Sequence, residues 1–122
     1  MKANELRRYN LVYRCSPNKV EIIKVQSISN YFINGLGISA IEPILIDEYW
    51  LLRFGFESVK KEDNNYSFFA LNKKRKNNPK PPIDIYKKKT FFYGHNINHC
   101  KYVHQLQNLY FALTNTELEI KL

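Results

Sequence analysis

Hydrophobic residues in the first 46 positions are spaced as in short β-strands, with partial alternation and turn-forming residues between the runs. The pattern predicts strands at residues 11–13, 19–25, 28–33 and 38–46. Asn34-Gly35 predicts a tight hairpin between the last two strands, because both residue types tolerate the positive φ angles of such a turn. Pro43 cannot donate a ladder hydrogen bond, so it indicates an edge strand or a bulge.

A short central helix is predicted at residues 48–54, where Trp50, Leu51 and Phe54 give an apolar face. Asp47 fits the N-cap position, because its carboxylate can accept a free N–H of the first turn and its charge suits the helix dipole. Gly55 is the expected C-terminal stop. A helix of two turns does not persist alone in water, so we expect it to pack on a sheet.

The rest of the chain predicts a hairpin or meander followed by the clearest helix. Strand-like segments lie at residues 66–71, 83–86 and 90–93, whereas residues 57–65, 72–82 and 94–98 have the composition of loops or turns. Apolar residues at helical spacing predict an amphipathic helix at residues 102–114, which ends at Thr114-Asn115 and lies on the sheet.

Alternating Leu118, Ile120 and Leu122 predict a final short strand. The fold class that follows is α+β: a bent antiparallel sheet with a short central helix and an amphipathic C-terminal helix. With 122 residues and no linker-like stretch, the chain is expected to form a single domain over residues 1–122.

The net charge of +8 arises within residues 60–101, which form a basic, aromatic-rich insert. Eleven basic and three acidic residues fall there, whereas the eight basic and eight acidic residues elsewhere cancel. Concentrated positive charge attracts polyanions, so nucleic acid or a nucleoprotein is the expected partner. An AT-rich genome would also raise the lysine content, and the alternative is therefore a solvated basic face without a ligand.

Two residue types in this segment are candidate contacts. Those predicted to contact phosphates are Lys73, Lys74, Arg75, Lys76, Lys80, Lys87, Lys88 and Lys89. Tyr86, Phe91 and Tyr93 are predicted to stack on bases if they are exposed. The alternative for the aromatic side chains is burial in the core.

The three histidines and a cysteine fall within ten residues: His95, His99, Cys100 and His104. Imidazole and thiolate are zinc ligands, but there is no Cys-x-x-Cys and all four could converge only if residues 95–101 folded back on the helix. Two imidazoles could also serve a metal-free ribonuclease, with Lys89 or Lys101 stabilising charge. The favoured interpretation is structural, with no metal, no cofactor and no catalytic residue.

Three stretches resemble a family of small proteins from Bacteroidetes genomes and their phages. They are residues 5–13, residues 41–56, and YVHQLQNLYFALT at residues 102–114. The family has no established activity and supplies no catalytic residues, so the resemblance implies a phage or mobile-element setting. Residues 60–101 depart from the family pattern, and a function particular to this chain would be grafted there.

In that setting the expected function is that of a non-enzymatic, anti-CRISPR-like inhibitor that binds a host RNA-guided nuclease or its guide RNA. A general RNA- or DNA-binding accessory protein and a small histidine-dependent ribonuclease are the alternatives. Neither a secretory signal nor an apolar stretch of membrane-spanning length is visible, and Cys15 and Cys100 do not make a disulfide framework. The cytoplasm of a bacterial host is the expected compartment, with no membrane or small-molecule partner.

Overall fold

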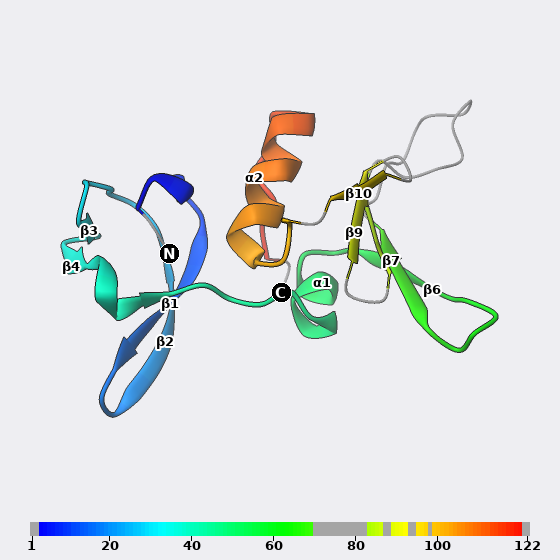
Figure 1. Cartoon of the computed structure of the whole chain (residues 1–122), viewed down its shortest axis with the longest axis horizontal. Helices are drawn as coiled ribbons and strands as arrows, with labels where there is room; N and C mark the ends of the chain where they lie inside the picture. Colours follow the sequence, from blue (N-terminus) through cyan, green and yellow to red (C-terminus); the bar gives the residue numbers. More distant parts are fainter. Residues whose placement is uncertain (1–2, 70–82, 87–88, 93–94, 98, 121–122) are drawn as a thin grey trace. The chain divides into compact units, whose positions relative to one another are not determined.

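The computed structural model describes residues 3–69, 83–86, 89–92, 95–97 and 99–120 (Figure 1). They form an α+β fold with antiparallel sheets, as predicted. The strands are divided among three sheets rather than joined in one. Two compact units result: unit 1 comprises Met1–Leu45 and Tyr102–Glu117, and unit 2 comprises Ile46–Lys101 and Leu118–Leu122. The single-domain organisation stays a prediction.

Unit 1 contains two sheets. The elements before its C-terminal helix are η1 (Ala3–Glu5), β1 (Leu11–Ser16), β2 (Lys19–Lys24), β3 (Phe32–Ile33), β4 (Leu36–Gly37), η2 (Ile38–Ala40) and β5 (Ile41–Glu42). One sheet has the order β2-β1-β5 and the other is the hairpin β3-β4. The predicted Asn34-Gly35 turn is confirmed, with φ angles of 52° and 76°.

Two of the predicted strands are largely wrong. Only Phe32–Ile33 is a strand within residues 28–33, and an isolated bridge joins Ile28 to Ile33. The predicted strand at residues 38–46 is replaced by the short 3-10 helix η2 and the two-residue strand β5. Pro43 follows β5 directly and lacks the N–H that a longer ladder would need.

The core of unit 1 gathers apolar residues from several elements: Ala3, Leu6, Val12, Val25, Ile33 and Ile41. The predicted C-terminal helix is confirmed as α2 (Val103–Thr114), which ends at Asn115 with φ 55°. Its buried face differs from the predicted apolar stripe, because His104 and Gln107 are buried with Val103 and Leu106. Leu113, at the other end of the stripe, is exposed.

Polar side chains of α2 bind the irregular segment before β1. The Leu11 N–H donates to Gln107 Oε1 at 2.8 Å, and Gln107 Nε2 donates to the Tyr9 carbonyl at 3.3 Å. At the next residue of the helix, Asn108 Oδ1 accepts from Asn10 Nδ2 at 2.8 Å. Buried backbone groups that have no partner in a helix or sheet still need one, and α2 supplies it here.

Unit 2 contains α1 (Glu48–Arg53), which begins where predicted and ends one residue before the predicted end at Phe54. The Trp50 N–H donates to Asp47 Oδ1 at 3.0 Å, which confirms the N-cap. Gly55 has φ 84°, and the N–H groups of Gly55 and Phe56 donate to the carbonyls of Leu52 and Leu51. These two bonds make a Schellman ending of the helix.

The remaining strands of unit 2 form a five-stranded antiparallel meander of order β10-β9-β8-β7-β6 (Figure 1). They are β6 (Glu57–Lys60), β7 (Tyr66–Phe69), β8 (Ile83–Tyr86), β9 (Lys89–Phe92) and β10 (His95–Ile97). Strands β7, β8 and β9 were predicted, apart from residues outside the described ranges. Strands β6 and β10 instead replace a predicted loop and a predicted turn.

The predicted final strand is wrong where the structure describes it, because residues 117–120 have no regular secondary structure. Leu118 is nevertheless buried. Alternation can therefore bury one side chain without giving its backbone a ladder partner. Among the described residues, no helix is both long and apolar enough to cross a membrane.

Candidate nucleic-acid interface

The pairing register assigns the residues of the five-stranded sheet to two faces, because directly opposite residues in an antiparallel pair share a face. On one face, Phe68 lies opposite Ile85, which lies opposite Thr90. All three are buried, so this is the core face. The other face carries a row of residues across four strands: Val59, Ser67, Tyr86 and Lys89. Ser67 is buried, whereas the other three are exposed or half-buried. We call it the open face.

Tyr86 and Lys89 lie opposite each other on the open face, next to the connection between β8 and β9. Tyr86 is half-buried and Lys89 is exposed. The Tyr86 hydroxyl donates to the Asp63 carboxylate, which belongs to the turn between β6 and β7. This bond holds the far end of the phenol. The register places Lys89 directly opposite Tyr86 on the same face.

Acidic residues also lie on this face. The Ser67 hydroxyl donates to Asp84 Oδ1 at 2.5 Å, and Asp84 lies beside Phe69 in the next row. Among the described positions of residues 57–101, four basic and four acidic residues cancel. The positive excess of this segment therefore belongs to residues 70–82 and 87–88, which lie outside the described residues.

The topology fixes where these two basic connections join the sheet. Residues 70–82 run from Phe69 to Ile83, whereas residues 87–88 run from Tyr86 to Lys89. They therefore attach at opposite ends of β8, which are about 10 Å apart at roughly 3.4 Å per residue. The turn at residues 61–65 shares the Tyr86 end, because Lys60 pairs with Tyr66 and Ser67 with Tyr86.

Most of the predicted contact residues cannot be placed. Eight lie outside the described residues: Lys73, Lys74, Arg75, Lys76, Lys80, Lys87, Lys88 and Tyr93. The side chain of Phe91 also lies outside the described residues. Tyr86 and Lys89 are the pair that the register brings together. Sequence reasoning missed the Asp63 contact to Tyr86, because no local pattern links residues 23 positions apart.

The histidines do not converge on a site in the part of the chain that is described. His104 is buried, with an exposed fraction of 1% and no hydrogen-bond partner for either ring nitrogen. The Tyr102 ring stacks on it with centroids 5.8 Å apart. Burial lowers the pKa of His104 and keeps it neutral, while the charge of Glu5 opposes this shift. A buried imidazole cannot reach a phosphate, so the ribonuclease alternative loses this histidine.

Among the other members of the predicted cluster, Cys100 is unsuited to metal binding or nucleophilic chemistry. Burial raises the pKa of the Cys100 thiol, which opposes the thiolate that a metal ligand or nucleophile requires. His99 is exposed, and the side chain of His95 lies outside the described residues. Within the described ranges, no group of three or more histidine, cysteine or acidic side chains could hold a metal ion.

Comparison with known proteins adds no assignment. No family model matches the chain, and neither a curated protein nor a solved structure matches it. The resemblance to small Bacteroidetes and phage proteins therefore stays a prediction.

Proposed function

We propose that the protein is a non-enzymatic binder of nucleic acid or nucleoprotein that uses the open face of the five-stranded sheet and the basic connections at its ends. The observation that carries the proposal is the in-register pair of Tyr86 and Lys89 at the end where residues 87–88 join the sheet. An aromatic ring beside an ammonium group suits a base and the phosphate attached to it.

The distribution of charge favours a strand that runs along β8. Lysines hold phosphates without reading sequence, and the basic connections attach at both ends of this strand. Asp84 between them repels phosphates but can accept a hydrogen bond from the amino group of a base. The backbone of the ligand is therefore held at the two ends and its bases lie over the middle.

The resemblance to phage and mobile-element proteins suggests the biological target. In the cytoplasm of a bacterial host, a nucleic-acid-binding surface of this kind would engage an RNA-guided nuclease or its guide RNA and inhibit it. A general RNA- or DNA-binding accessory role is the second candidate. The two candidate functions differ in their effect on the nuclease. Only an inhibitor lowers target cleavage by the nuclease at protein concentrations too low to bind bare RNA.

Fluorescence anisotropy with a labelled single-stranded RNA tests the binding proposal. Replacement of Lys87 and Lys88 by serine should weaken binding, because two phosphate contacts are lost. The matched control replaces Lys19 and Lys24 by serine. Both lysines are exposed on β2 of unit 1, and their replacement removes the same amount of charge. Equal weakening by both pairs would show that only net charge matters, and would contradict an interface on the sheet.

A further inference from the structure

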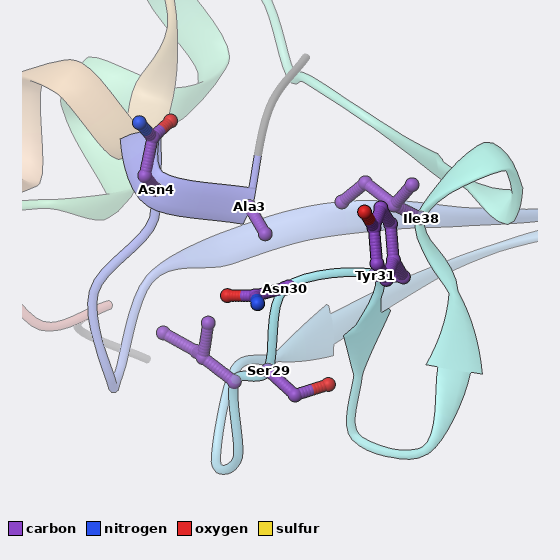
Figure 2. Close-up of a pocket in the computed structure, with 7 residues that line it drawn as sticks. Ala3, Asn4, Ser29, Asn30, Tyr31 and Ile38 are labelled. Atoms are coloured by element: carbon purple, nitrogen blue, oxygen red, sulfur yellow. The ribbon is translucent and has the colours of Figure 1, made fainter.

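Unit 1 contains a hollow of about 650 Å³ that the polyanion proposal does not use (Figure 2). Its walls come from η1, from residues 28–31 and from Ile38 of η2. The volume lies within the range of about 300–1,000 Å³ that is typical of ligand sites. The hollow is therefore large enough for a small-molecule ligand.

Part of the lining of the hollow is apolar and packs on the folded core. Ala3 and Ile38 both pack in the core cluster of unit 1, and Ile28 adds a third aliphatic side chain. The walls are tied by backbone bonds: the Ser29 N–H donates to the Phe32 carbonyl, and the Ile38 N–H donates to the Tyr31 carbonyl, each at 2.9 Å. The site is thus formed before any ligand arrives.

The rim is polar and carries no charge. Asn4 and Asn30 are exposed, and neither carboxamide has a hydrogen-bond partner among the described residues. Tyr31 has an exposed fraction of 71%, and Figure 2 shows its ring beside Ile38, with Asn4 on the other side of the hollow. Two carboxamide residues and an aromatic residue therefore line the hollow together with aliphatic side chains.

We infer that this hollow binds a nucleobase. Adenine is the base used in the test below. A neutral lining gives no attraction for phosphate, whereas aliphatic and aromatic groups pack against the faces of a planar ring. Carboxamides match the adjacent donor and acceptor of a base edge, as asparagine does with adenine. An acyl chain would instead remove both carboxamides from water without offering them a hydrogen bond.

The base can belong to a free nucleoside or to a nucleic-acid strand, because the recognised chemistry is the same. This inference does not rest on the proposed function, since the hollow lies within unit 1 and the basic connections belong to unit 2. The two proposals can therefore fail separately. Adenosine, which has no phosphate, isolates the hollow from the polyanion surface.

The test is an NMR titration of the full-length protein that follows the side-chain amide resonances of Asn4 and Asn30. Adenosine should shift both resonances saturably, and Tyr31→Ala should abolish the saturation while Tyr31→Phe keeps it. Asn30→Ala should weaken binding about fivefold, the usual effect of one lost hydrogen bond. Tyr49→Ala, at another exposed tyrosine, is the matched control and should change nothing.

A parallel titration with oligoadenylate separates the two sources of the base. Saturation with adenosine assigns a free nucleoside, whereas Tyr31-dependent shifts with the oligonucleotide alone assign a base within a strand. If neither ligand shifts Asn4 and Asn30, or if Tyr31→Ala binds as well as the wild type, the hollow is not a nucleobase site.

Discussion

Replacement of His104 by leucine should make unit 1 more stable, although it removes a native aromatic contact. Both ring nitrogens of His104 are buried without hydrogen-bond partners among the described residues. An unsatisfied buried polar group costs roughly 1–3 kcal/mol, and leucine removes this cost at similar size. The stacking contact with Tyr102 is lost, so we expect a net gain of about 1 kcal/mol at pH 7.5.

The same substitution should remove an acid sensitivity. Burial lowers the pKa of His104 in the folded state, so the unfolded chain takes up its proton first. The contribution to stability is fully present above the unfolded pKa of about 6.5 and is lost as the pH falls below it. The loss amounts to at most about 1.4 kcal/mol per pH unit. Glu5 opposes the shift and reduces this slope.

Urea unfolding followed by circular dichroism at pH 7.5, 6.5 and 5.5 measures both effects. His99→Leu is the matched control, because His99 is exposed and its replacement should leave the pH dependence unchanged. Wild type and His99→Leu should lose stability together below pH 6.5, and His104→Leu should lose less. If all three proteins respond equally to acid, the reasoning from the buried imidazole is refuted.

Three further changes have expected outcomes. Asn34→Ala should destabilise unit 1 by about 1–3 kcal/mol in urea unfolding, because Asn34 accepts hydrogen bonds from two N–H groups and donates one to the Lys24 carbonyl. An unchanged unfolding midpoint would show that these hydrogen bonds do not stabilise unit 1. Asp47→Ala should lower the stability of unit 2 by about 1 kcal/mol, measured by Trp50 fluorescence, because the N-cap is lost. A measured loss below about 0.3 kcal/mol would contradict the role of Asp47 as the N-cap. Tyr86→Ala should weaken single-stranded RNA binding at least about fivefold in anisotropy measurements, as expected for one lost stacking contact. Tyr86→Phe should retain wild-type affinity. An equal loss of affinity in both variants would assign the effect to the hydroxyl group.

Features set by neighbouring residues could be predicted from the sequence. The Asn34-Gly35 turn depends on the positive φ angles that these two residues tolerate, and the Asp47 cap depends on one side chain near a helix start. Strand β6 was missed because all four of its residues are exposed, so hydrophobic spacing gives no signal. Its position is set by the hydrogen bonds to β7.

Long-range polar contacts explain the other features that could not be predicted from the sequence. Gln107 is buried on α2 because it pairs with backbone groups of Tyr9 and Leu11, nearly a hundred positions earlier. In the candidate interface, composition identified Tyr86 and Lys89 separately. Only the strand register shows that they lie opposite each other, and that the Tyr86 hydroxyl is held by Asp63.

The salt dependence of single-stranded RNA binding tests the proposed function most directly. Each phosphate neutralised contributes a slope of about −0.7 in a plot of log affinity against log salt, so one contact from each of seven basic residues gives about −5. We expect this slope for the wild type and its loss when seven residues are replaced by serine: Lys73, Lys74, Arg75, Lys76, Lys87, Lys88 and Lys89. An absence of binding at low salt, or an unchanged slope in the variant, would contradict the assignment of the basic connections as the nucleic-acid interface.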